Sequence, residues 1–244
     1  MTMNKYDDEK FFDKYSKMAR SVYGLKGAGE WHELKKMLPD LEGKSVLDLG
    51  CGFGWHCKYA AQHGAKDIVG IDSSERMLAQ AEKINADKNI EYRKASIEEL
   101  QVNSEAFDVV ISSLALHYVE DFQQVCEKVH HGLREKGYFV FSVEHPIFSA
   151  YGNQQWYTDE SGKILHWPVD NYFYEGKRES NFLGEEVTKY HRTLTSYIGT
   201  LLKCGFEIID VVEPMPPKEM LDEVEGMRDE LRRPMMLLIS ARKK

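Results

Sequence analysis

One segment constrains the fold of this chain more than any other, the run SVLDLGCGFG at residues 45–54. Its apolar positions before the first glycine predict a short strand that is buried on both faces. Gly50, Gly52 and Gly54 then allow the backbone to turn sharply and to approach a ligand without side-chain clash. A helix is expected to follow, so the segment predicts a strand, a ligand-binding turn and a helix N-terminus.

The spacing of the glycines restricts the ligand. A dinucleotide fingerprint has the pattern G-x-G-x-x-G, with the pyrophosphate at the helix N-terminus. Here the spacing is G-x-G-x-G, and Asp48 precedes the first glycine by two residues. We therefore expect a ligand with a cationic amino-acid end rather than one with two phosphates.

The rest of the chain alternates apolar strand-like runs with helical patterns, which is typical of a doubly wound α/β fold with a parallel sheet. Strands are expected at 45–49, 67–71, 90–94, 107–112, 137–143, 206–212 and 235–240. Helices are expected at 74–86, 121–133, 192–203 and, in an acidic stretch, 217–230. We predict one domain over residues 1–244, with a helical cap at 1–40 and an insertion at 145–190.

Composition excludes several classes of protein. The net charge of −8 disfavours an extended phosphate-binding surface, so nucleic acid is not expected as a partner. Neither a membrane-spanning run nor a signal peptide is recognisable, and we expect a cytoplasmic protein without a membrane partner. The four cysteines lack metal-type spacing, so reduced thiols and no metal site are predicted.

Residues 48–54, together with Asp72 at the end of the next apolar run, resemble the class I S-adenosylmethionine-dependent methyltransferases. The resemblance continues through residues 107–118 and 137–141, and the motifs cover roughly residues 44–145. It implies a Rossmann-like, seven-stranded, mostly parallel sheet of order 3-2-1-4-5-7-6 with the last strand antiparallel. The segments EHP at 144–146 and KYHRT at 189–193 resemble sequences of a small-molecule branch of that family.

The resemblance implies S-adenosylmethionine as the cofactor, bound at the carboxyl ends of the strands. Asp48 would meet its ammonium group and Asp72 its ribose hydroxyls, although both also suit structural carboxylates in turns or at helix N-termini. Where the family often has an acid for adenine, this chain has Ser96, so packing by Ile97 is expected there. The other residues implied to contact the cofactor are Tyr15, Arg20, Gly50, Cys51, Gly52, Gly54, Ser73, Met77, Ser113, Leu114 and His117.

The sequence indicates fewer residues for binding the methyl acceptor than for binding the cofactor. Transfer of a methyl group from a sulfonium needs mainly positioning, and a base only if the nucleophile carries a proton. His145 follows the fifth strand and is the candidate base, while His191 and Arg192 are candidate substrate contacts. Each of these residues, and His117, also suits a purely structural role.

Ten aromatic residues within 145–190 predict a lid over a small-molecule pocket, or alternatively a satellite core or a dimer surface. A small-molecule methyl acceptor and a monomer or homodimer are expected. Two other functions remain open: a non-catalytic S-adenosylmethionine-binding module, and a nicotinamide-dependent oxidoreductase that would share Asp72 and the glycine turn.

Overall fold

A seven-stranded sheet forms the centre of the protein in the computed structural model, which describes residues 4–244. Its spatial order is β10-β11-β5-β4-β1-β2-β3, and β11 is antiparallel to both of its neighbours. This is the predicted 3-2-1-4-5-7-6 order with an antiparallel last strand, so the fold prediction is confirmed. The strands are β1 (Ser45–Leu49), β2 (Asp67–Asp72), β3 (Ile90–Lys94), β4 (Phe107–Ser113), β5 (Leu133–Glu144), β10 (Phe206–Val212) and β11 (Met236–Lys243).

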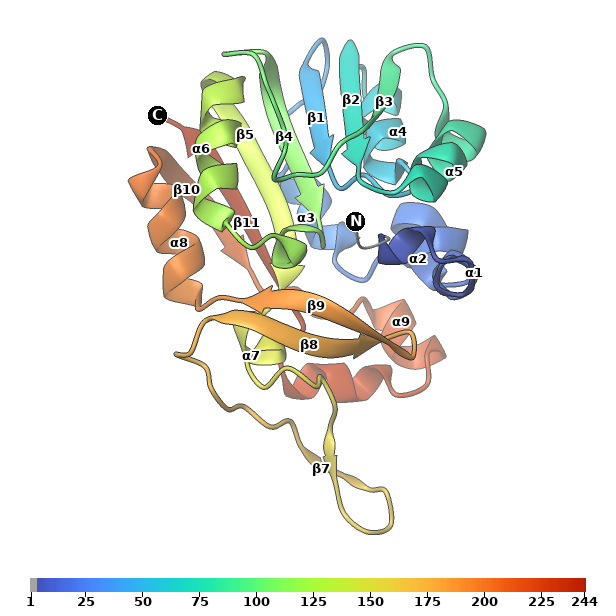
Figure 1. Ribbon diagram of the computed structural model, residues 1–244. Helices are drawn as coiled ribbons and strands as arrows, with labels where there is room; N and C mark the ends of the chain where they lie inside the picture. Colours follow the sequence, from blue (N-terminus) through green and yellow to red (C-terminus); the bar gives the residue numbers. More distant parts are fainter. Residues whose placement is uncertain (1–3) are drawn as a thin grey trace.

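Helices cover both faces of the sheet (Figure 1). On β1, Leu47 and Leu49 belong to the core cluster shared with α6 and α8, whereas Val46 belongs to the cluster shared with α4 and α5. This alternation follows from the two-residue period of a strand. Helix α3 packs on the same face as α4, through Leu34 and Met37. The helices are α3 (Trp31–Met37), α4 (Trp55–Gln62), α5 (Glu75–Asn85), α6 (Phe122–Gly132) and α8 (Leu194–Lys203).

Side-chain caps determine where three helices begin. Ser74, Asp121 and Thr193 each accept a hydrogen bond from a backbone N–H in the first turn of α5, α6 and α8. Because Thr193 is the cap, Arg192 lies outside α8. The expectation that this arginine occupies the first helical turn is therefore wrong.

Two other predicted boundaries differ from the structure. The fifth strand begins at Leu133 rather than 137, directly after α6, and contains Lys136 at φ 63° beside a register irregularity with β4. The acidic stretch is divided at Gly226, which has φ 77°, into α9 (Lys218–Glu223) and the 3₁₀ helix η4 (Met227–Arg232). A backbone in the left-handed region ends a helix, and periodicity alone does not reveal it.

The N-terminal segment lies along the edge where the parallel strands end (Figure 1). It consists of η1 (Lys5–Asp7), α1 (Glu9–Ser16), α2 (Ala19–Val22) and η2 (Gly24–Gly27). The predicted cap at 1–40 is thus divided, because α3 packs on the sheet instead.

The insertion after β5 also forms regular structure. It contains α7 (Pro146–Ser149) and two hairpins, β6 (Tyr157–Thr158) with β7 (Ile164–His166), and β8 (Gly176–Phe182) with β9 (Glu185–His191). Figure 1 shows β8 and β9 crossing the carboxyl ends of the parallel strands, while the β6–β7 hairpin projects from the body. Within residues 4–244, no helix has the length and apolar character needed to cross a membrane. All four cysteines are unpaired.

Candidate active site

The glycine turn forms an open cradle after β1. The amides of Gly50 and Cys51 both donate to the Ile71 carbonyl at 2.9 Å, which fixes the turn against β2. Gly50, Gly52 and Gly54 have φ values of 72°, 53° and 75°. A Cβ on Gly52 would meet only the Tyr15 hydroxyl, at 4.0 Å, and would project into open space. The turn therefore offers backbone amides and room to a ligand.

Asp72 anchors the other side of this cradle. Its Oδ2 accepts from the Gly52 amide at 3.0 Å and its Oδ1 accepts from the Ser74 amide at 2.9 Å. Burial raises the pKa of this carboxyl, and the two backbone hydrogen bonds oppose the rise. Each oxygen retains a lone pair that a ligand hydroxyl can use.

A cavity of about 810 Å³ joins the glycine turn to the β8–β9 hairpin. This volume lies within the range of about 300–1,000 Å³ that is typical of small-molecule sites. A second cavity of about 60 Å³ adjoins it and includes Cys51. Twelve of the predicted site residues line the larger cavity: Tyr15, Arg20, Gly50, Gly52, Asp72, Ser73, Met77, Ser96, Ile97, Ser113, Leu114 and His117.

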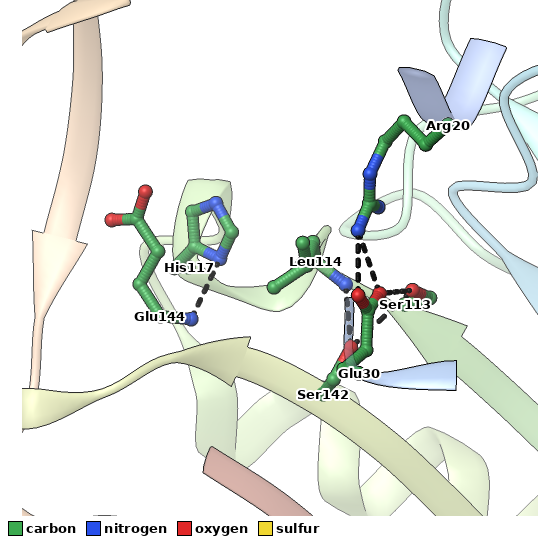
Figure 2. Close-up of polar contacts among 7 residues, drawn as sticks. All are labelled: Arg20, Glu30, Ser113, Leu114, His117, Ser142 and Glu144. Atoms are coloured by element: carbon green, nitrogen blue, oxygen red, sulfur yellow. Dashed lines mark hydrogen bonds and ion pairs between the residues drawn. The ribbon is translucent and has the colours of Figure 1, made fainter. Parts of the chain in front are cut away.

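Arg20 and Ser113 line both cavities and contact the buried Glu30 carboxylate (Figure 2). Arg20 Nη2 lies 2.7 and 2.8 Å from the two carboxylate oxygens of Glu30, and the Ser113 hydroxyl donates to Glu30 Oε1 at 3.2 Å. Burial alone would raise the pKa of Glu30, but the Arg20 guanidinium outweighs burial and lowers it. Glu30 was not predicted as part of the site, because an acid just before a helix is ordinarily a surface residue.

The turn after β4 carries a strained residue. Leu114 has φ 51°, which is uncommon for a residue with a branched side chain. Its amide donates to both the carbonyl (2.9 Å) and the hydroxyl (3.1 Å) of Ser142 on β5, which holds the turn in place. In Figure 2, Leu114 lies between the Arg20 group on one side and His117 with Glu144 on the other. This turn therefore divides the cavity into two halves.

His117 occupies the second half. Its Nδ1 accepts from the Glu144 amide at 3.4 Å, and Figure 2 shows Nε2 on the opposite side of the ring. Its pKa is lowered to about 4, mainly by burial; the Glu144 carboxylate opposes this shift, and the charges of Lys189, Arg192 and Arg20 contribute to it. The ring is therefore neutral at physiological pH.

A buried polar group that the sequence did not predict lies beside His117. Lys189 Nζ on β9 donates to Glu144 Oε1 at 2.6 Å and to Gln154 Oε1 at 2.9 Å, and Gln154 Nε2 donates to Glu144 Oε2 at 2.6 Å. The Tyr6 hydroxyl donates to the Tyr118 hydroxyl at 3.1 Å on the same cavity wall. One feature of the sequence pointed to this group: Glu144 and Lys189 belong to the segments 144–146 and 189–193, which resemble the small-molecule branch of the family.

His145 lies outside the cavity. Its Nδ1 accepts from the Ile147 amide at 3.0 Å as the cap of α7, and its Nε2 lies 2.7 Å from Glu213 Oε1. Both ring nitrogens are thus directed at the protein. The geometry does not support the predicted role of His145 as a base, because the turn into Pro146 rotates the ring into the α7 cap.

His191 and Arg192 are also directed into the protein. The ring of His191 lies between the Ser149 hydroxyl (2.8 Å) and the Tyr172 carbonyl (2.9 Å). Arg192 Nη2 donates to the carbonyls of Val119 and Glu120. Neither residue lines the cavity, so the structure does not support their predicted contact with the substrate. Both side chains instead hold neighbouring loops in place through these hydrogen bonds.

Three predicted cofactor residues have structural partners as well. Asp48 is buried on the α4 side of β1, where its Oδ2 accepts from the Cys57 thiol at 3.3 Å, and burial raises its pKa to about 7. It does not line either cavity. A Cβ on Gly54 would clash with the Tyr92 hydroxyl, so this glycine serves packing. Ser96 lines the cavity, but its hydroxyl donates to Glu99 Oε2 and accepts from the Glu99 amide.

Within the described part of the chain, no group of three or more His, Cys, Asp or Glu side chains has the arrangement of a metal site.

Comparison with known proteins agrees with this geometry. A family model described as "Methyltransferase domain" matches residues 47–141. A solved structure of a candidate S-adenosylmethionine-dependent methyltransferase from Listeria monocytogenes is 59% identical, with a TM-score of 0.86 over 91% of this chain and 99% of that one. The chain belongs to the class I S-adenosylmethionine-dependent methyltransferase family.

Two further relatives match this methyltransferase over nearly its whole length. A solved S-adenosylmethionine-dependent methyltransferase from Mesorhizobium loti is 43% identical, with a TM-score of 0.84 over 90% of this chain and 100% of that one. A protein of Haemophilus influenzae is 34% identical over 245 residues, which cover 98% of this chain and 96% of the relative. The family membership confirms the predicted enzyme class and cofactor, and it leaves the nicotinamide alternative without support.

Proposed function

We propose that this methyltransferase transfers a methyl group from S-adenosylmethionine to a small molecule held beneath the β8–β9 hairpin. The observation that carries the proposal is the continuous cavity of about 810 Å³. It is lined on one side by the glycine turn and Asp72, and on the other by residues of the insertion. A covered site of this size suits a small acceptor better than a polymer.

In this proposal the cofactor occupies the half of the cavity next to β1 and β2. Asp72 binds the ribose hydroxyls, because its carboxylate is fixed by two amides and keeps free lone pairs. Met77 and Ile97 pack against the adenine, and the Gly52 cradle leaves room for the methionine end. Arg20 lies where it can bind the methionine carboxylate, and its ion pair with Glu30 holds the guanidinium in place.

The bound sulfonium supplies a methyl group that is already activated. The protein therefore contributes mainly positioning and exclusion of water. The Leu114 turn, held by Ser142, fixes the boundary between the two halves of the cavity. Lys189 links β9 to Glu144 at the end of β5, and this link holds the hairpin over the acceptor half.

Labelled-methyl transfer distinguishes this proposal from its alternatives. The protein is incubated with methyl-labelled S-adenosylmethionine and, in separate reactions, a protein-free metabolite extract and total tRNA. The proposal predicts label in small molecules alone. Label in tRNA contradicts the small-molecule assignment, and binding of S-adenosylhomocysteine without any transfer indicates a non-catalytic binding module.

A further inference from the structure

Three hydrogen-bond donors meet in the acceptor half of the cavity. The first is Lys189, whose side chain is buried and whose Nζ carries three N–H groups. Among residues 4–244, Glu144 and Gln154 accept two of them. One N–H is therefore left for a ligand in the cavity that this lysine lines.

His117 is the second donor. A neutral imidazole carries one proton, and the nitrogen that accepts a hydrogen bond does not bear it. Because Nδ1 accepts from the Glu144 amide, the proton is on Nε2, on the far side of the ring (Figure 2). His117 therefore presents an N–H to the cavity rather than a lone pair.

Tyr118 is the third donor. Its hydroxyl accepts from the Tyr6 hydroxyl at 3.1 Å, which leaves its own hydrogen free to donate. The ring of Tyr118 lies 4.5 Å from the His117 ring, and its centre lies 6.0 Å from Lys189 Nζ. The three donors are thus close neighbours on one wall.

The Glu144 carboxylate beside this wall is paired. It accepts from Lys189 Nζ at 2.6 Å and from Gln154 Nε2 at 2.6 Å. Its charge is therefore offset by that of Lys189, and an incoming oxyanion would meet the remaining N–H and O–H donors of Lys189, His117 and Tyr118.

The same residues offer only a weak proton acceptor to a neutral nucleophile. The unprotonated nitrogen of His117 accepts from the Glu144 amide. The Glu144 carboxylate keeps lone pairs, but burial, which would raise its pKa, is outweighed by His117, Lys189 and Gln154, and the lowered pKa makes it a weak base. The site therefore favours a nucleophile that arrives already deprotonated. A carboxylate meets this requirement at neutral pH, since its pKa is about 4, whereas a phenol with a pKa of about 10 does not.

From these contacts we infer that the acceptor is a small apolar carboxylic acid, which the enzyme converts to its methyl ester. The inference rests on the proposed function. One carboxylate oxygen forms the new O–CH₃ bond while the S–CH₃ bond breaks, and the electron pair remains on the sulfur. The negative charge of the acid and the positive charge of the sulfonium cancel, and no proton moves. Apolar walls receive the body of the acid: Met18, Phe148, Phe182, Val187, Met235 and Met236.

Calorimetry on protein saturated with S-adenosylhomocysteine tests the binding part. The probes are benzoate, phenylacetate and hexanoate, each compared with its primary amide. We expect at least one acid to bind about tenfold or more tightly than its amide, because a charge-assisted hydrogen bond exceeds a neutral one by roughly this factor. Acids that bind no better than the amides, or that do not bind, overturn the inference.

The donor wall is tested with Tyr118→Phe, which removes one hydroxyl and keeps the ring. Acid affinity is expected to fall about fivefold while S-adenosylhomocysteine affinity stays unchanged. Tyr190→Phe is the matched control, because that hydroxyl contacts Glu120 outside the cavity. An equal effect of the two variants contradicts the assignment. Substitution of Lys189 is less useful, since it leaves Glu144 buried without its partner.

The chemistry is tested with methyl-labelled S-adenosylmethionine and a panel of monocarboxylic acids with their matched alcohols and amines. A methyl ester releases volatile methanol in alkali, whereas a methyl ether or methylamine does not. Alkali-labile label is expected with acids only. Alkali-stable label on an alcohol or amine, or no transfer to any acid, overturns the inference; retained S-adenosylhomocysteine binding then shows that the cofactor site itself is intact.

Discussion

At the scale of single residues, two aspartates at the ends of neighbouring strands lie in different environments, one in the core and one in the cavity. Asp48 on β1 and Asp72 on β2 both precede turns at the carboxyl edge of the sheet. The strand pleat turns Asp48 towards α4, where Cys57 is its partner, and Asp72 enters the cavity. A motif predicts the position of a carboxylate, whereas the face on which its oxygens lie depends on packing.

The Asp48 carboxyl is predicted to make stability depend on pH. Burial, opposed by the Cys57 hydrogen bond, raises its pKa from 3.8 to about 7. The folded state therefore holds this proton more strongly than the unfolded state, and this residue's contribution to stability is lost as pH rises from about 4 to 7. At about 1.36 kcal/mol per pKa unit, the loss is at most about 4 kcal/mol.

Thermal unfolding of the wild type and Asp48→Asn at pH 5 and pH 8 checks this prediction. The amide has no charge to bury, so the variant should gain stability relative to the wild type between pH 5 and pH 8. A stability difference that is the same at both pH values contradicts it.

Substitution of Asp72 is predicted to weaken cofactor binding. In Asp72→Asn, an NH₂ group replaces one oxygen and faces either the Gly52 or the Ser74 amide, so the carboxylate geometry at the ribose site is lost. We expect S-adenosylhomocysteine affinity to fall at least about tenfold, equivalent to about 1.4 kcal/mol. Asp67→Asn, at the opposite end of β2, is the control and should bind like the wild type; similar losses in both variants would count against the ribose assignment.

At the scale of elements, the buried cation Arg233 packs against aromatic rings of the insertion. The Arg233 guanidinium lies 4.6, 5.0 and 4.2 Å from the ring centres of Phe148, Trp156 and Trp167 and pairs with Glu230 at 2.6 Å. All three rings lie between β5 and β8, and two of them, Trp156 and Trp167, lie within residues 150–170. The segment therefore depends on a residue that is far away in the sequence.

Arg233→Met is predicted to loosen this segment. Loss of a desolvated cation–π contact costs on the order of 2 kcal/mol. Hydrogen exchange should accelerate in residues 150–170, while S-adenosylhomocysteine affinity is retained. Arg228→Met, an exposed arginine paired with Asp222, is the control. Unchanged exchange in Arg233→Met would show that the segment is held by other contacts.

At the scale of the whole molecule, the strand pattern was predictable because each buried strand is a short apolar run between turn residues. The sheet order came from family resemblance, since apolar runs do not encode direction. The histidines show the limit of prediction within the site: His117 and His145 follow strands and His191 is the last residue of β9, yet of these three only His117 lines the cavity. Capping by His145 and hydrogen bonds to His191 arise from contacts that a linear pattern does not contain.

Ligand binding is also predicted to stabilise the whole chain. A ligand at 100 times its Kd that binds only the folded state adds about 2.7 kcal/mol. For a chain of this size, differential scanning fluorimetry should show a rise in Tm of roughly 5–10 °C with S-adenosylhomocysteine. NAD should produce no shift, and a shift with NAD alone would favour a dinucleotide site.

Isothermal titration calorimetry with S-adenosylhomocysteine tests the central claim most directly, namely that the glycine turn and Asp72 form a site for the methyl donor. The expected result is saturable heat with one site per chain, which is strongly reduced in Asp72→Asn and unchanged in Asp67→Asn. The absence of heat from the wild type at high micromolar ligand, or equal binding by Asp72→Asn, would contradict the claim.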